Sequence, residues 1–538
     1  MRGLIDESGR GARAGWLVAA AEWLLITLAF AAAGAWPTPD VNEAVYLTKA
    51  RHAADPDWAR GDFFLETPAA HGVFYRAIGP LAARLSLDQT AWIGRLIGWG
   101  LLAAGFRCAI APLLATTWGR VLAALLFSFA LRNTTAAGEW VIGGCEAKVF
   151  AWAAVLGGLG EIARGRFPAA VFSCGVATAL NPIVGGWSLL ATVATWLVGR
   201  MVGERSEVAH AIDRKQVSWI AVGLIAAGLA AAAAGVVPAL GLAAGVDATT
   251  RVEATRIYVV DRLSHHLLPR TFADGMVARH VLAVATWWLL AGLLPAAAAR
   301  RRIATFTGVA LTISLAGLAV AALEPWAPAA AHGLLKYYWF RLADVIVPLA
   351  LATTLAAVLG DDAICGRLAA CRPGVVRGAA IGLLGLDLAV QSLHWPLPGR
   401  SGVAPRADAK VVAEPWAEIC QWVRTHVPAD ACFLTPRGAA SFTWRTDRRE
   451  VVSWKNSPQD AASLVEWRRR ILDCFSRSGS MVELERSTVS LGPDRLREVA
   501  ERYGADHAIV PLDAPRIEAM PGERLHDNGT YAVYRLRP

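Results

Sequence analysis

The sequence predicts a mainly helical protein that crosses a membrane many times and ends in a small α/β domain. The chain has 538 residues, of which 55% are hydrophobic and only 18% are charged, and its mean hydropathy is +0.40. Long runs of Ala, Leu, Val and Gly alternate with short loops that contain Arg, a pattern typical of polytopic helical membrane proteins. Beyond residue 396 the apolar runs become short and polar residues dominate.

The first predicted span covers 16–35 and follows an arginine-containing amino terminus. About 20 apolar residues are enough to cross a hydrocarbon core about 30 Å thick. No small-residue cleavage site precedes Trp36, so we interpret the segment as an uncleaved span and not as a signal peptide. Glu22 lies within it, where an unpaired carboxylate costs at least about 2.5 kcal/mol. We therefore expect Glu22 to be paired or functional.

The remaining apolar runs bring the predicted number of spans to about 11, with the amino terminus in the cytoplasm and the carboxyl terminus outside. The short Arg-rich loops then all lie on the cytoplasmic side, including a basic stretch at 200–215. The predicted protein is a multi-pass inner (cytoplasmic) membrane protein. Its further spans are expected at 89–106, 110–131, 150–160, the two arms of a hairpin whose outer turn is NPIVGG (181–186), 217–240, a segment that returns to 299–302, 303–323, 342–359 and 379–393.

The loop at 36–88 is too long and too polar to be a simple connection between spans, so we expect it at the outer face of the membrane. Asp40 and Glu43 are three residues apart and share one face of a helix that starts at Asp40. The same spacing also fits a capping box, in which both residues only stabilise the helix start. We interpret this loop as the active-site loop of a membrane enzyme.

Further charged and aromatic residues lie near the outer ends of later spans. Cations hold a phosphate and a carboxylate handles a proton, so this combination suits a lipid-linked phosphate. His265 and His266 are alternatively metal ligands, but they lack HxxxH spacing. Arg341 and Asp344 are three apart and alternatively pair with each other. The candidates for this outer rim are Glu146 as an acid and Arg95, Lys148, Arg262, His265, His266, Lys336, Tyr338 and Arg341 as substrate-binding residues.

Four short segments resemble the first-loop motifs of the GT-C glycosyltransferases, in particular the aminoarabinose transferase and protein mannosyltransferase branch. They are NEAVY (42–46), ARHAADPDW (50–58), HGVFY (71–75) and GRL (94–96). Later segments such as GGCEAKVFAW and LSHHLLPRTF are similar to an uncharacterised bacterial membrane family of unknown function. The resemblance implies a GT-C-like transmembrane domain over 1–395, with its outer loop at 36–88.

The resemblance also implies an activity, the inverting transfer of a sugar from a polyprenyl-phosphate donor to a lipid, glycan or protein of the cell envelope. It implies that Asn42, Tyr46, His71 and Tyr75 bind substrate. The family's first-loop catalytic acid falls on Asn42, and an amide is no base. Either Asp40 or Glu43 then takes over that role, or the transfer chemistry has been lost, while Glu146 matches the acid of the second outer loop. The catalytic candidates are therefore Asp40, Glu43 and Glu146.

The expected partners are the lipid-linked sugar and membrane lipid. Nucleic acid is not expected, because the basic residues lie in short loops between spans. No motif specifies a cofactor, and a divalent cation remains an alternative. One rival is a secondary transporter that uses Glu22, Arg95, Arg120 and Asp387. The other is a non-catalytic scaffold whose outer domain binds a partner.

The carboxyl-terminal part divides into a linker at 396–402 and an extracytoplasmic domain at 403–538. Amphipathic helices are predicted at 416–428 and 458–477, strands at 431–437, 450–456 and 505–512, and a hairpin with a type I′ turn at Asn528-Gly529. Lys455, Asn456 and Gln459 form either a glycan contact or a plain loop. Three cysteines of this domain are candidates for one disulfide, namely Cys420, Cys432 and Cys474.

Overall fold

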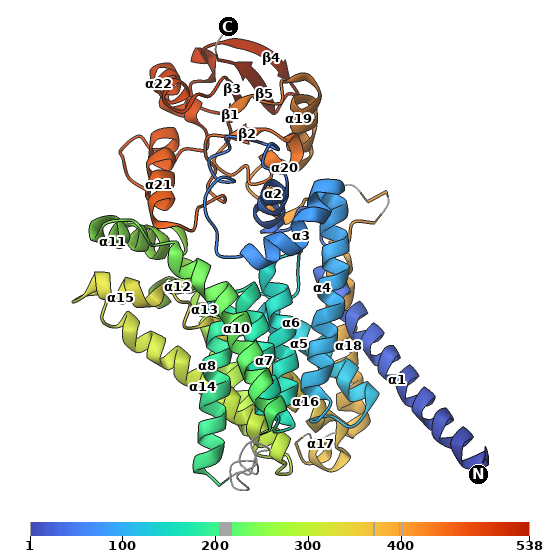
Figure 1. The fold of residues 1–538 in the computed structure, drawn as a ribbon. Coiled ribbons are helices and arrows are strands. Elements are labelled where there is room, and N and C mark those ends of the chain that lie inside the picture. Colours follow the sequence, from blue (N-terminus) through green and yellow to red (C-terminus); the bar gives the residue numbers. More distant parts are fainter. Residues whose placement is uncertain (1, 204–217, 369–371, 398, 401, 537–538) are drawn as a thin grey trace.

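The computed structural model describes residues 2–203, 218–368, 372–397, 399–400 and 402–536. Most of the predicted basic stretch at 200–215, from residue 204 onward, lies outside these residues. Helices pack side by side into a bundle, and a small sheet domain lies at one end of it (Figure 1). We call that end the domain end. The bundle and its flanking helices are α1 (Arg2–Gly34), α4 (Leu87–Ile110), α5 (Thr117–Asn133), α6 (Ala147–Ala163), α7 (Phe167–Leu180), α8 (Pro182–Met201), α10 (Trp219–Gly241), α11 (Ala248–Arg256), α12 (Ser264–Leu267), α13 (Asp274–Ala291), α14 (Ala298–Ala321), α15 (Pro328–Leu335), α16 (Arg341–Gly360), α17 (Asp362–Leu368) and α18 (Pro373–Ser392).

Among the described residues, 7 helices are long and apolar enough to cross a membrane, and they are α1, α4, α8, α10, α14, α16 and α18. The helices α5, α6, α7 and α13 lie among them and are shorter or less apolar. This agrees with a helical membrane protein. The larger number of spans expected from the sequence stays a prediction.

Two span boundaries differ from the sequence prediction. The predicted span at 110–131 is interrupted, because α4 ends at Ile110 and α5 begins at Thr117, where the Thr116 hydroxyl accepts a hydrogen bond from the backbone N–H of Gly119. The NPIVGG segment does contain the turn of a helical hairpin at the domain end, beside His71 of the first loop, but the turn is shorter than predicted. Asn181 alone separates α7 from α8, and its side chain caps α8 by accepting from the N–H of Val184. Asn at the cap and Pro at the first helical position both favour a helix start there.

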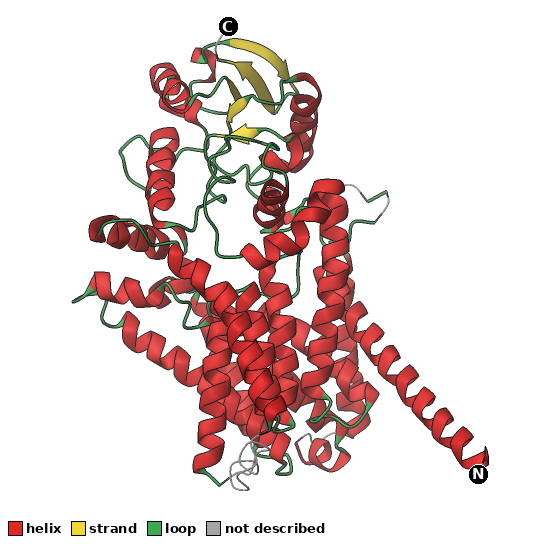
Figure 2. Ribbon diagram, in the orientation of Figure 1, coloured by secondary structure: helices red, strands yellow, loops and turns green. Residues whose placement is uncertain are grey.

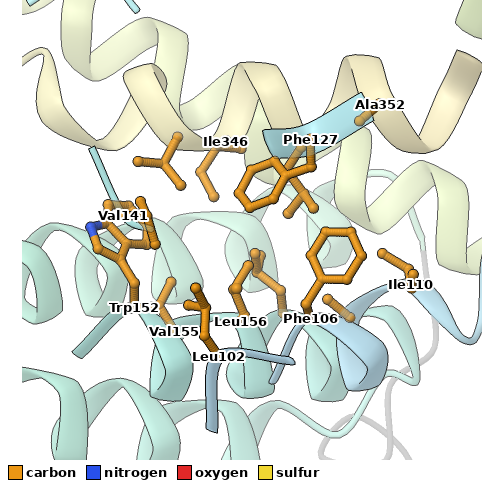
Figure 3. Close-up of a cluster of buried hydrophobic side chains, with 14 of the residues drawn as sticks. Leu102, Phe106, Ile110, Phe127, Val141, Trp152, Val155, Leu156, Ile346 and Ala352 are labelled. Atoms are coloured by element: carbon orange, nitrogen blue, oxygen red, sulfur yellow. The ribbon is translucent and has the colours of Figure 1, made fainter. Parts of the chain in front are cut away.

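The core of the bundle lies where α4, α5, α6 and α16 meet. Figure 3 shows side chains of these helices that face one another, and the rings of Phe106 and Phe127 stack with centroids 5.2 Å apart. Gly105 allows α4 to approach α6, because a Cβ there would lie 2.2 Å from the carbonyl oxygen of Ala153. The apolar stretch of α16 is 83% buried and that of α18 only 6%. Helix α16 is therefore central and α18 peripheral.

The first loop lies between the bundle and the sheet domain. It forms α2 (Glu43–Ala54) and α3 (Gly72–Arg84), so α2 begins at Glu43 and not at Asp40 as predicted. The Trp58 indole donates to Asp447 at 3.1 Å, and the N–H of Glu450 donates to the Asp62 carboxylate at 3.0 Å. These contacts join the loop to the sheet domain, so the two form one unit at the domain end.

The sheet domain has a 5-stranded sheet with the order β2-β1-β3-β5-β4, shown in yellow in Figure 2. Strand β1 pairs in parallel with β2 and β3, and β5 is antiparallel to β3 and β4. Helices α21 and α22 pack on one face and α19 and α20 on the other. The elements are α19 (Ala413–His426), β1 (Cys432–Leu434), α20 (Phe442–Thr446), β2 (Arg449–Glu450), α21 (Ala461–Phe475), α22 (Pro493–Tyr503), β3 (His507–Pro511), β4 (Glu523–Asp527) and β5 (Tyr531–Arg535).

Most of the predicted elements of this domain are present, with three differences. Strand β2 ends at Glu450, and the rest of the predicted strand is a loop. The hairpin exists, but only Gly529 has a positive φ (78°), whereas a type I′ turn needs two such residues. The three cysteines Cys420, Cys432 and Cys474 are free. Cys432 and Cys474 lie in the core on one face of the sheet, and Cys420 lies in the core on the other face. The predicted linker at 396–402 falls between α18 and α19, and its positions 398 and 401 are outside the described residues.

The buried contact between Glu450 and Asp62 makes stability depend on pH. Burial and the nearby Asp62 carboxylate raise the pKa of Glu450 to about 7 from 4.5. The folded state then binds more protons than the unfolded state between these two values, so stability falls as pH rises from about 4.5 to 7. We expect Glu450→Gln to flatten this fall in a melting-temperature series across that range. The exposed Glu523, which pairs with Arg535, provides the control Glu523→Gln. Equal slopes for wild type and Glu450→Gln would contradict the assignment.

Candidate functional site

Polar and aromatic side chains from distant parts of the chain meet between the bundle and the sheet domain. They come from α2, from the loop before α6 and its first turn, from the segment 257–266, from the loop between α15 and α16, and from the loop after β2. We call this set the interface cluster. It consists of Asn42, Tyr46, Glu139, Trp140, Glu146, Lys148, Tyr258, Arg262, His266, Tyr338, Arg341 and Lys455.

Two carboxylates and one ammonium group form the buried floor of the cluster. Lys148 Nζ lies 3.7 Å from Glu146 Oε2 and 3.9 Å from Glu139 Oε1, and 3.2 Å from the ring centroid of Trp140. Glu146 and Glu139 are 0% and 4% exposed. The Oε1 atom of each is buried and accepts no hydrogen bond. Buried polar atoms normally have partners. Glu139 Oε1 still lies in an ion pair with Lys148, so Glu146 Oε1 is the more available of the two oxygens to a ligand.

Glu146 has the surroundings of a general base. It precedes the first residue of α6, and the Asn42 amide donates to its Oε2 at 3.0 Å. Burial raises the pKa of this carboxyl, while Lys148 and Asn42 act in the opposite direction. A carboxylate with a raised pKa and one free oxygen is suited to accept a proton near neutral pH.

Cations surround this floor. Arg341 Nε lies 3.0 Å from Glu139 Oε2, and its guanidinium stacks 3.7 Å from the ring centroid of Tyr338. Arg262 donates to the backbone oxygen of Lys455 at 3.4 Å. Burial, and next the charge of Arg262, lower the pKa of Lys455 to about 8. The Nε atoms of Arg262 and Arg341 are buried and lack an aligned acceptor. The cluster thus offers several donors to an anion.

The backbone around the cluster is held in unusual conformations. Asp344 accepts hydrogen bonds from the N–H groups of Ala136, Ala137 and Glu139, which fixes the loop that carries Glu139. The predicted alternative of an Arg341–Asp344 pair is therefore wrong. Tyr258 and Arg262 lie on a π-helical segment (Ile257–Arg262), and Tyr338 has a φ of 56°. Both features are frequent at functional sites.

The candidate histidines are neutral near pH 7. His71 bonds to the Tyr46 hydroxyl at 3.3 Å, beside the ring of Tyr75, and burial lowers its pKa to about 4. The Nδ1–H of His266 donates to the Ala137 carbonyl at 2.6 Å, and burial together with His265 lowers its pKa to about 3. His265 is exposed, with its ring 4.1 Å from that of His266. These residues can position a ligand but cannot supply cations.

Asp40, Glu43 and Arg95 are engaged in ion pairs. Glu43 accepts from Arg95 at 2.7 and 2.6 Å, from the Cys145 N–H at 2.7 Å and from the Asp40 N–H at 2.7 Å. A capping box has two reciprocal bonds, and the bond from the Asp40 N–H to the Glu43 carboxylate is one of them. Asp40 accepts two bonds from Arg406 at 2.5 and 2.6 Å. Their catalytic role stays a prediction. Their carboxylate oxygens all accept hydrogen bonds, whereas Glu146 keeps one oxygen without a partner. Lys336 lies 5.2 Å from the ring centroid of Tyr337.

The charged residues on which the transporter interpretation depends are also paired. Glu22 accepts from Arg107 at 2.8 Å and from Arg120 at 2.7 Å. Asp387 accepts from Arg132, and Arg95 is held by Glu43. Each of these groups is neutralised where it lies, so they do not form a row of unpaired ion sites. Within the described part of the chain, no group of three or more His, Cys, Asp or Glu residues is placed to hold a metal ion.

Four residues of the interface cluster, Glu139, Trp140, Tyr258 and Lys455, were not predicted to belong to the site. Lys455 was expected in either a glycan contact or a plain loop of the outer domain, and the structure brings it close enough to interact with Glu146 and Lys148. Arg406 pairs with a residue 366 positions earlier. Periodicity and short motifs carry no signal for such distant contacts.

Comparison with known proteins gives one local match. A family model described as a domain of unknown function (DUF6798) matches residues 414–474, which run from α19 through β1, α20 and β2 to α21. No curated protein matches the chain. The matched segment is the part of the sheet domain that carries Lys455 into the interface cluster.

Proposed function

We propose that the chain is a membrane glycosyltransferase that moves a sugar from a polyprenyl-phosphate donor to a lipid, glycan or protein acceptor of the cell envelope. The observation that carries this proposal is the buried carboxylate of Glu146, whose Oε1 has no partner, among the cations Lys148, Arg341, Arg262 and Lys455. A group that takes a proton and groups that bind an anion thus share one site. A phosphate-leaving transfer requires both.

In the proposed reaction, the acceptor hydroxyl attacks the anomeric carbon of the donor sugar. The bond between that carbon and the phosphate oxygen breaks, and the electron pair leaves with polyprenyl phosphate. Glu146 Oε1 takes the hydroxyl proton, while Asn42 holds Oε2. Arg341 and Lys148 stabilise the charge that grows on the departing phosphate, as donors fixed before the reaction do in a site shielded from water.

The proposed orientation places the far end of the bundle in the cytoplasm. Arginines gather at that end, as the positive-inside rule requires. Arg164 and Arg166 follow α6, Arg200 lies in the last turn of α8, and Arg300 and Arg301 lie in the first turn of α14. The sheet domain and the interface cluster then face outward. We expect alkaline phosphatase fused to the carboxyl terminus to be active in a bacterial host and a green fluorescent protein fusion to be dark. The reverse pair of results would contradict the orientation.

The direct test of function uses membranes that contain the full chain, a set of labelled polyprenyl-phosphate sugars and envelope lipid and glycan acceptors. We expect label to move to an acceptor and free polyprenyl phosphate to accumulate in equal amount. Solute flux in proteoliposomes without any consumption of lipid-linked sugar would overturn the proposal in favour of a transporter.

A further inference from the structure

A cavity lies between the first loop and the sheet domain, and none of its lining residues belongs to the interface cluster. Its volume is about 370 Å³, within the lower range of small-molecule sites. One wall is the segment from Gly61 to Pro68, and the other is formed by β2 and the helices α21 and α22. The cavity therefore exists only when the first loop and the sheet domain lie together.

Arg449 is the unpaired cation of this cavity. Within the described residues its side chain makes no ion pair and no hydrogen bond, and its buried Nε lacks an acceptor. One of its Nη atoms lies close to Gly61, since a Cβ at that glycine would be 2.7 Å away, and the positive φ of Gly61 (81°) keeps that position open. The guanidinium is thus held at the wall by packing while its donors stay available. Such an arrangement leaves a fixed fork of N–H groups for a carboxylate or phosphate.

A second guanidinium is fixed nearby. Arg470 stacks 4.0 Å from the ring centroid of Phe63 and 4.7 Å from that of Tyr503. Its Nε donates to Glu466 at 2.8 Å and its Nη1 to the Val451 carbonyl at 3.1 Å. These contacts occupy one edge of the group, and its Nη2 has no partner among the described residues. Two arginines from neighbouring elements thus line the same small space.

Within the described residues, neither acidic residue of the wall forms an ion pair with Arg449. Glu66 accepts from the Gly61 N–H at 2.6 Å. Glu450 accepts from Thr435 and Asn456, both at 2.8 Å, and its pKa is raised to about 7 by burial. Glu66 keeps its negative charge, but this side chain is exposed to water, which screens the charge, whereas the Nε of Arg449 is buried and has no acceptor. The cavity wall therefore has N–H donors without acceptors, and an anion would accept hydrogen bonds from them.

We propose that this cavity binds a small anionic ligand, a sugar-sized molecule that carries one carboxylate or phosphate group. Arg449 binds the charged group through its free N–H groups, with Arg470 beside it. The hydroxyl of Ser463 also lines the cavity and makes no hydrogen bond in the described part of the chain, so it is available to a ligand hydroxyl. Because the site is formed by both the first loop and the sheet domain, the ligand also holds these two together. The inference does not depend on the proposed transfer reaction.

The experiment is calorimetric titration of the purified full chain in detergent with glucuronate, glucose 6-phosphate and glucose. We expect at least one of the two anions to bind and glucose to bind at least about tenfold more weakly, since only the anions can form a charge-assisted hydrogen bond with Arg449. The anion that binds more tightly identifies a carboxylate or a phosphate ligand. Arg449→Gln should weaken binding by a similar factor, and Arg449→Lys should weaken it less.

Two further variants make the result decisive. Arg497→Gln removes an exposed arginine of α22 that pairs only with Asp494, and it should leave binding unchanged. Ser463→Phe fills the cavity without changing charge and should abolish binding even if Arg449→Gln proves unstable. Binding that survives Ser463→Phe, equal binding of glucose and the anions, or no binding of either anion at millimolar concentration would each overturn the proposal.

Discussion

Glu146→Gln should reduce sugar transfer by about a hundred- to ten-thousandfold while the protein remains folded in the membrane. The change keeps the size of the side chain and the position of Oε2, which accepts from Asn42, but it replaces the free Oε1 by an oxygen or nitrogen that cannot take a proton. General-base catalysis contributes an effect of this size. The measurement is the rate of label transfer from polyprenyl-phosphate sugar in membranes with matched amounts of protein.

The matched control is Glu139→Gln. Glu139 lies in the same cluster, is 4% exposed and also lies beside Lys148 and Arg341, so this variant removes the same charge from nearly the same place. We expect a smaller loss of transfer, because Glu139 forms an ion pair with Arg341 and is not the group proposed to take the proton. Equal losses in both variants would mean that the cluster needs its net charge and not a base at Glu146. Full activity of Glu146→Gln would remove Glu146 from the mechanism.

The fold class was predictable because it depends on local pattern. Each long apolar run in the sequence is a helix in the structure, and α19, β1, α21 and β3 arise where alternation or helical periodicity predicted them. The errors occur where short-range hydrogen bonds decide. Thr116 and Asn181 start helices through their side chains, and a hydropathy pattern does not register either effect.

The candidate site was predictable only in its residue types. Glu146, Lys148, Arg262 and Arg341 were chosen because carboxylates and cations near the outer ends of the predicted spans suit a lipid-linked phosphate, and the structure brings these four together. The sequence could not predict which carboxylate keeps an oxygen without a hydrogen-bond partner. Glu43 and Arg95 are 52 positions apart in sequence, so the bond that occupies Glu43 is invisible to any rule on spacing.

The same ion pair gives the largest expected effect on stability. Glu43→Ala should lower the free energy of unfolding by about 3–5 kcal/mol, the cost of leaving one partner of a buried ion pair alone. Arg95 is 1% exposed and would keep only the Trp36 carbonyl as an acceptor. The N–H groups of Asp40 and Cys145 would lose their acceptor as well. The measurement is the melting temperature and urea midpoint of the purified chain in detergent.

The double variant Glu43→Ala with Arg95→Met separates a structural role of Glu43 from a catalytic one. Removing both charges leaves no buried ion without a partner, and such replacements are often neutral, so the double variant should recover much of the lost stability. If Glu43 only holds the loop, transfer activity should return together with stability. If Glu43→Ala is as stable as wild type and yet inactive, the carboxylate acts on substrate and the base is Glu43, as the spacing of the first loop suggested. Loss of stability with recovery in the double variant instead leaves Glu146 as the group that meets the acceptor.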